Sequence, residues 1–243
     1  LRIGKKGIVQ LSDNALIQNG SAKNGGNITM FGKLYISEGV KITGGSATNH
    51  GSAINLFSNY DDADCVLNMT GGIIEGSIRY DSNKGSVKVE LLGGKVDEVI
   101  MYNSAVTNLY VGGNVQVQRV HLESGKSILI HKDGLKNASV GVSMDDTSKP
   151  FAVVTTAAEE TCFHPYDEQS YDIVSTDRAL YLKAKVKPHA HCVCGGTLSG
   201  AAQDAHSGCE SVGDWTALTK ENFVVGGTRP CGRSIVLGAD EMA

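Results

Sequence analysis

Proline, aromatic residues and long apolar runs are all scarce in this chain of 243 residues. It has 4 prolines against 30 glycines, so it does not have the Pro- and Gly-rich composition of a disordered polymer. Aromatic residues make up 6% of the chain and hydrophobic residues 41%, which favours short aliphatic strands joined by small turns over a large helical core. No apolar run approaches the roughly 20 residues that a membrane-spanning helix needs.

Concentrated charge is also lacking. The net charge is −4 and the lysines and arginines are scattered, whereas a nucleic-acid-binding face needs them clustered. We therefore expect no nucleic-acid partner. The chain begins at Leu1 without a signal peptide, which we interpret as the start of a processed or excised piece of a larger protein.

A glycine-punctuated segment recurs along the chain. Residues 17–26 align with residues 42–51 at an offset of 25 residues. A second motif is the end of a short apolar run followed by a pair of glycines. It occurs at 41–45, 68–72, 90–94 and 109–113, and in a degenerate form at 130–134. The last glycines of these segments are 27, 22, 19 and 21 residues apart, as expected for coils whose corner loops vary in length.

Short runs of alternating apolar and polar residues lie between the glycines. Residues 33–36, 87–91 and 115–120 alternate with period two, which predicts strands with one buried face. Strands from successive repeats would stack about 4.8 Å apart around a shared aliphatic interior. The predicted fold is all-β: a right-handed parallel β-helix over residues 1–185. The alternative is an antiparallel barrel or sandwich, in which Asn-Gly and Asp-Gly hairpin turns would be more frequent.

The repeats also resemble a known family. Residues 42–55 and 67–77 are similar to the degenerate coils of large cell-surface proteins from Gram-positive gut anaerobes, which have the pectate-lyase-like β-helix fold. Residues 136–185 look like the closing coils of such modules. The resemblance implies an adhesin-like repeat protein that is extracellular, at the cell surface. Host or cell-wall glycans or proteins would be its partners.

The composition changes after Lys187-Pro188, where cysteine and histidine cluster. Thiolate and neutral imidazole are the ligands of tetrahedral structural zinc sites. We predict a Zn²⁺ site formed by Cys192, Cys194, His206 and Cys209. A segment with the same cysteine and histidine pattern also resembles one found between β-helix modules of the gut-anaerobe proteins.

Two alternatives to this zinc site remain open. Cys192 and Cys194 are separated by one residue, whereas paired zinc cysteines are usually two to four residues apart. His189 or His191 could replace one of the ligands. In an oxidising exterior the cysteines could instead form disulfides, for instance Cys209 with Cys231, or stay as free thiols.

The domain organisation follows from this change in composition. We expect a parallel β-helix over 1–185, a Cys/His module over 186–213, and the start of a further module or a terminal cap over 214–243. The sequence assigns no role to residues 228–243.

The sequence shows no clear catalytic constellation. Asp61, Asp62 and Asp64 form the one tight acidic group, in a predicted corner loop, and Arg79 could lie on the next coil as the base of a polyuronate lyase. A glycosidase needs two carboxylates at a set separation, and nothing singles out such a pair. We interpret the acidic group as a solvated turn.

Cys162 and His164 are the candidates for nucleophilic chemistry, because residues two apart on a strand share a face. No third orienting group accompanies them, so we expect Cys162 to be a packed core residue. Cys65 also looks like a core residue. Candidates for stacking on sugars are Tyr60, Tyr80, Tyr102 and Tyr110.

From these observations we expect a non-catalytic structural or adhesive module. The alternatives are a subunit that assembles end to end into an extracellular filament, and a carbohydrate-active enzyme of the polysaccharide lyase or hydrolase class.

Overall fold

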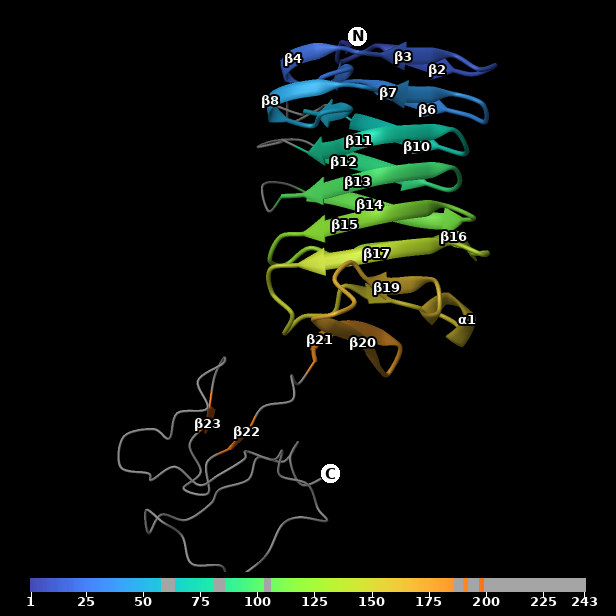
Figure 1. The fold of residues 1–243 in the computed structure, drawn as a ribbon. Helices are drawn as coiled ribbons and strands as arrows, with labels where there is room; N and C mark the ends of the chain where they lie inside the picture. The colour runs from blue at the N-terminus through green and yellow to red at the C-terminus, as the bar shows by residue number, and fades with distance from the viewer. Residues whose placement is uncertain (58–63, 81–85, 103–105, 186–189, 192–196, 199–243) are drawn as a thin grey trace, which may run out of the picture. The chain divides into compact units, whose positions relative to one another are not determined.

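The computed structural model describes residues 1–57, 64–80, 86–102, 106–185, 190–191 and 197–198 (Figure 1). The chain divides into two compact units, Leu1–Lys185 and Val186–Ala243. The first unit contains almost all of the described strands and is a parallel β-solenoid of about six turns. No described helix is long and apolar enough to cross a membrane.

Two long sheets run along the solenoid. Sheet A contains β1 (Arg2–Ile3), β5 (Ile28–Met30), β9 (Ile54–Leu56), β11 (Ile73–Tyr80), β13 (Lys95–Met101), β15 (Gln116–Leu122), β17 (Ser139–Met144) and β19 (Phe163–Pro165), with β3 (Leu16–Gln18) and β7 (Lys41–Thr43) joining at β11. Sheet B contains β2 (Ile8–Leu11), β6 (Lys33–Ile36), β10 (Asp64–Met69), β12 (Ser86–Leu91), β14 (Val106–Gly113), β16 (Ile128–Leu135), β18 (Ala152–Val153), β21 (Ala179–Ala184) and β20 (Tyr171–Thr176). A third, short parallel pair is formed by β4 (Ser21–Asn24) and β8 (Ser46–His50).

Strands of successive coils pair in parallel, from β1 with β5 to β17 with β19. The all-β parallel solenoid predicted from the glycine repeat is therefore confirmed, and the antiparallel barrel or sandwich is excluded. Among the strands that the structure describes in this unit, antiparallel pairing involves only the closing strands, where β21 pairs with both β18 and β20.

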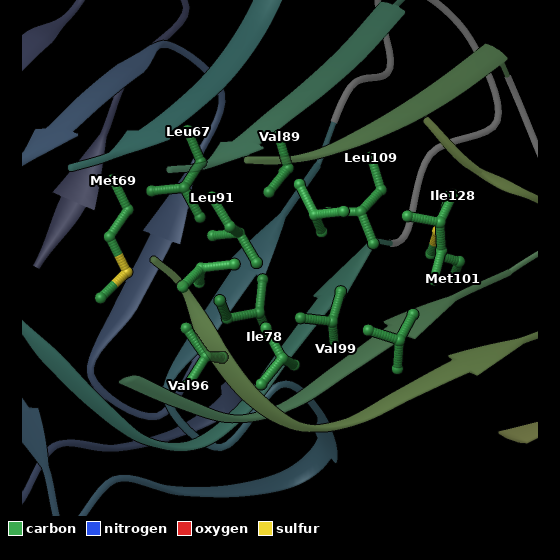
Figure 2. Packing of buried hydrophobic residues seen from close by; sticks show 14 of the residues in the cluster. Leu67, Met69, Ile78, Val89, Leu91, Val96, Val99, Met101, Leu109 and Ile128 are labelled. Carbon is green, nitrogen blue, oxygen red and sulfur yellow. The ribbon is translucent and has the colours of Figure 1, made fainter. Parts of the chain in front are cut away.

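The core consists of ladders of aliphatic side chains that repeat at each coil. On sheet A, one register position is held in turn by Ile28, Ile54, Ile78, Val99, Val120 and Val142. On sheet B, an equivalent ladder contains Leu34, Leu67, Val89, Leu109 and Ile128. Figure 2 shows side chains of both ladders meeting in the narrow interior. Each such side chain contributes about 1.5–3 kcal/mol by its burial.

The paired glycines of the repeat form the corners between sheet B and sheet A. Gly72 lies between β10 and β11, and Gly94 occupies the same place one coil later. Their φ angles are 88° and 84°, in the region that side chains with a Cβ avoid. A Cβ on Gly94 would also collide with the carbonyl oxygen of Gly72, so these corners require glycine both for conformation and for stacking.

The two ends of the solenoid differ. After β18 the chain forms a one-turn helix, α1 (Ala157–Glu160), and the β20–β21 hairpin then borders the last coil. At the first coil the inward-facing Val9, Leu11, Ala15 and Ile17 pack on the core but are only partly buried. No described strand covers the outer edge of that coil.

Candidate binding groove on sheet A

Two consecutive outward-facing residues interrupt the normal alternation in β13 and β15. Val96 and Val99 both point into the core, so the two residues between them both face outward. Val117 and Val120 repeat this arrangement one coil later, and register shifts mark the bulge in β11 and in β15. A bulge changes the direction of the side chains and places two consecutive residues on the outer face of the strand. Polar groups therefore concentrate on this face of sheet A.

The outward residues of three coils lie in register. Ser77, Glu98 and Arg119 are successive partners on β11, β13 and β15. They line a groove of about 250 Å³, which we call the sheet A groove. Its other lining residues are Ser52, Gly76, Asp97, Gln118 and Tyr166.

Arg119 is the central cation of the sheet A groove. Its Nη1 lies 3.0 Å from Oε1 of Glu98, and its Nε donates to Oγ of Ser143 at 3.0 Å. The guanidinium carbon lies 4.9 Å from the centroid of the Tyr166 ring. Arg119 and Glu98 are about one-third exposed, so solvent screens their attraction, and the pair positions the groups more than it stabilises the fold.

The polar network extends from Ser143 toward the C-terminal coils. Nδ1 of His121 lies 3.1 Å from Oγ of Ser143, and its Nε2 lies 3.4 Å from Oδ1 of Asp145. Tyr166 is fixed at this end because its backbone N–H donates to the carbonyl oxygen of Val142 at 2.8 Å. This bond holds the backbone of Tyr166 at a place from which its ring lies beside Arg119.

The opposite end of the groove is formed by hydroxyl groups and a carboxylate. The backbone N–H of Ser77 donates to Oγ of Ser52 at 2.8 Å, and the backbone N–H of Ser52 donates to Oγ of Ser77 at 3.0 Å. Oδ2 of Asp97 accepts a hydrogen bond of 2.8 Å from the backbone N–H of Gly76. These reciprocal contacts hold hydroxyl and carboxylate oxygens at the groove surface.

This arrangement can bind a ligand rich in hydroxyl groups. The groove offers a guanidinium and an amide as donors, carboxylates and serine oxygens as acceptors, and one aromatic ring. Small, rigidly positioned polar groups beside a ring are suited to the alternating hydroxyl and C–H faces of a sugar. The individual hydrogen bonds within the network leave further donor and acceptor capacity on Gln118 and both serines.

The sequence did not single out this groove, although it carries a signal for it. Val-Asp-Glu-Val at 96–99 and Val-Gln-Arg-Val at 117–120 both space the apolar residues three apart, where a regular strand spaces them two apart. The polar pairs inside these motifs are the groove residues. Ser52, Ser143 and Tyr166 come from corners and other strands, and no local pattern connects them.

Cys162 and His164 have different hydrogen-bond partners in the structure. Sγ of Cys162 is directed to the carbonyl oxygen of Ala158 at 3.6 Å, and the residue is 6% exposed. Nε2 of His164 lies 3.1 Å from Oγ of Ser139. Cys162 is thus the packed core residue that the sequence favoured.

Cys65 is also a core residue, as predicted. It is fully buried, and burial raises the pKa of its thiol to about 12, opposed by a backbone hydrogen bond from Phe57. A neutral thiol in this position is a poor nucleophile.

The acidic residues considered for a lyase site lie outside the described side chains. Asp61 and Asp62 lie outside them, as does the side chain of Asp64. Arg79 stacks its guanidinium 3.8 Å from the ring centroid of Tyr102.

The tyrosines proposed to stack on sugars have different environments. Tyr80 is 1% exposed and points into the core, so its assignment to a sugar-binding surface was wrong. Tyr102 lies beneath Arg79, and Tyr110 lies on sheet B near Lys88. Tyr60 is outside the described residues. The tyrosine of the sheet A groove is instead Tyr166.

The predicted zinc ligands Cys192, Cys194, His206 and Cys209 lie outside the described residues, as do His189 and the side chain of His191. The boundaries proposed within 186–243 lie there too. Within the part of the chain that the structure describes, no group of three or more His, Cys, Asp and Glu side chains could hold a metal ion.

Comparison of the chain with protein-family models, with curated proteins and with solved structures finds no significant match.

Proposed function

We propose that the chain is a non-catalytic, extracellular structural and adhesive module of a bacterial cell-surface protein. The observation that supports this proposal is the sheet A groove on a rigid scaffold. Its polar side chains are fixed by hydrogen bonds across consecutive coils, from the Ser52–Ser77 pair to Arg119 with Glu98 and Ser143. A continuous aliphatic core lies directly behind them.

The proposed ligand of the groove is a glycan of the host surface or of the cell wall. A volume of about 250 Å³ accommodates on the order of one or two sugar rings, so a longer glycan would lie across the coils. Arg119 would donate to ring hydroxyl groups, and Asp97 and Gln118 would add an acceptor and a donor beside it. Contacts of this kind can bind a glycan, and they do not need to stabilise the charged intermediate of a reaction.

A glycan panel tests both halves of this proposal. The purified chain should bind one or more glycans and should release neither hydrolysis nor elimination products. Turnover of any glycan would overturn the non-catalytic assignment in favour of the carbohydrate-active enzyme. If the chain binds no glycan of the panel, the proposed adhesive role is wrong.

A variant pair locates the binding surface. Arg119→Gln should weaken glycan binding about ten-fold, because it removes a charged donor from the groove. Lys95→Gln is the matched control, since it removes one positive charge from an exposed position on the neighbouring strand β13. Equal affinities for the two variants would place the binding surface elsewhere.

The C-terminal unit enters the proposal through its cysteines and histidines. We propose that Cys192, Cys194, His206 and Cys209 bind one structural Zn²⁺, which would join this module to the next one. Metal analysis of protein purified without chelator, together with thiol titration, should give about one zinc per chain. Absence of zinc with fewer titratable thiols would assign these residues to disulfides instead.

One observation also favours the alternative of end-to-end assembly. The first coil presents partly buried core residues and an outer edge that no described strand covers, and Leu1, Ile8 and Leu16 are more than half exposed there. Free strand edges of this kind pair readily with other chains. A second copy of the chain could therefore associate at this end.

A further inference from the structure

A second hollow lies on the outer face of sheet B, on the side of the chain that the proposed glycan site does not use. It has a volume of about 640 Å³, in the range of small-molecule sites. It forms where β16 passes to the short strand β18 at the last coils, and we call it the sheet B pocket. Its lining includes Tyr110, Leu129, Ile130, Val153, Lys126 and Lys149.

The floor of the sheet B pocket is an outward apolar ladder. Leu109 pairs with Ile128, and Ile128 pairs with Ala152 in the next coil. Figure 2 shows Leu109 and Ile128 pointing into the core. Because side chains alternate along a strand, the residues that follow these three, Tyr110, Leu129 and Val153, face outward on adjacent coils.

This ladder differs from the outward positions of the two coils before it. The same outward register position is held by Asn68 and Glu90 on the two preceding coils, where Nδ2 of Asn68 donates to Oε2 of Glu90 at 3.0 Å. The surface therefore changes from polar to apolar at Tyr110. Leu129 is 36% exposed and Val153 is 61% exposed, so apolar area is available to a ligand.

Two lysines give the pocket its charge. Lys126 follows the turn at Gly125, and Lys149 precedes Pro150. No carboxylate is among the lining residues that the structure describes. Glu123 and Asp146 are close enough to interact with Lys126 and Lys149 respectively, and they reduce the positive field without entering the pocket. Burial lowers the pKa of Lys126, and an anion beside it would favour the charged form.

We infer that the sheet B pocket binds a small organic acid with an aromatic or branched aliphatic body. The body would cover Leu129 and Val153 and contact the ring of Tyr110. The carboxylate or sulfonate group would lie at Lys126 or Lys149. This site is independent of the sheet A groove and goes beyond the proposed structural and adhesive function.

A fluorescent aryl sulfonate provides the test. The full chain is titrated with 8-anilinonaphthalene-1-sulfonate, which should bind saturably with enhanced emission. Val153→Gln should weaken this binding about ten-fold, because the change places a polar group on the apolar floor at an exposed position that tolerates substitution. Ile8→Gln is the matched control: Ile8 is 64% exposed, lies on the distal strand β2 of the same sheet, and its change should leave the affinity unaltered.

The charge requirement is tested separately. Lys126→Gln combined with Lys149→Gln should weaken binding of the sulfonate about ten-fold, and should leave binding of the uncharged analogue N-phenyl-1-naphthylamine unchanged. Equal loss with both probes would overturn the preference for an acid. Absence of sulfonate binding, or binding that Val153→Gln does not weaken while Ile8→Gln does, would overturn the site itself.

Discussion

Single side chains stabilise this protein according to the direction in which they point. Ile78 and Ile73 lie on the same strand, β11, and differ in this respect. Ile78 is fully buried between Ile54 and Val99 in one ladder, whereas Ile73 faces outward and is 38% exposed. The register therefore assigns the same residue type two different energetic roles.

Ile78→Ala should lower the free energy of unfolding by about 3 kcal/mol, because it leaves a cavity between two close-packed coils. Ile73→Ala should cost less than about 1 kcal/mol. Urea unfolding of the two variants, followed by circular dichroism, measures the difference. Similar losses would contradict the assignment of inward and outward faces on β11.

Among the elements, the turn around α1 depends on one carboxylate. Glu159 is 5% exposed, and its Oε2 accepts the backbone N–H of Thr155 at 2.7 Å, the hydroxyl of Thr155 at 2.8 Å and the backbone N–H of Thr156 at 3.2 Å. A backbone hydrogen bond from Leu135 links it to β16. Burial alone would raise the pKa of Glu159, but these donors outweigh it and the pKa is lowered.

Glu159→Gln should destabilise the protein by about 1–3 kcal/mol at pH 7, because buried donors lose a charged acceptor. Since the folded pKa lies below the unfolded value of about 4.3, the contribution is present above that pH and is lost as the pH falls through the folded pKa. Unfolding of the parent protein and of Glu159→Gln should be measured between pH 3 and about pH 7. The difference in their free energies of unfolding should become smaller at the acid end.

Glu160→Gln is the control for this experiment. Glu160 is adjacent in sequence and accepts an exposed hydrogen bond from Ser175. Its change should shift stability by less than about 0.5 kcal/mol. A constant difference between Glu159→Gln and the parent protein at every pH would contradict the role of the ionised carboxylate.

At the scale of the whole molecule, the described strands are arranged differently at the first and last coils. The antiparallel β20–β21 hairpin borders the last coil, so a parallel strand of another chain cannot continue sheet B at β18. The first coil offers β2 as an edge strand, with Ile8 facing outward and Val9 and Leu11 only partly covered.

If copies associate through this edge, sedimentation should show larger species as the concentration rises. Ile8→Lys should reduce them, because it places a charge on the exposed edge strand. Ile73→Lys, on the interior strand β11, should leave them unchanged. A single species of monomer mass at all concentrations would contradict association at the first coil.

The sequence alone determined the fold class. Glycine pairs spaced 19–27 residues apart, with period-two strands between them, specify corners and one buried face. The corner at Gly94 and the buried position of Val89 are marked by the residues beside them in the sequence, although Gly94 must be glycine also because of the carbonyl oxygen of Gly72 one coil earlier. These signals were sufficient to predict the parallel solenoid and the buried state of Cys65 and Cys162.

Only the tertiary structure decided which outward residues meet. Ser77, Glu98 and Arg119 are 21 residues apart from one to the next, and coil lengths vary elsewhere, so the register of Ser77 with Glu98 depends on the bulge in β11, whereas β13 and β15 pair without a shift. A shift by one position would send each of these side chains to a different ladder. The same dependence on register brings Tyr110, Leu129 and Val153 together on sheet B. The binding surfaces are therefore properties of stacking between coils, which a single strand's sequence does not encode.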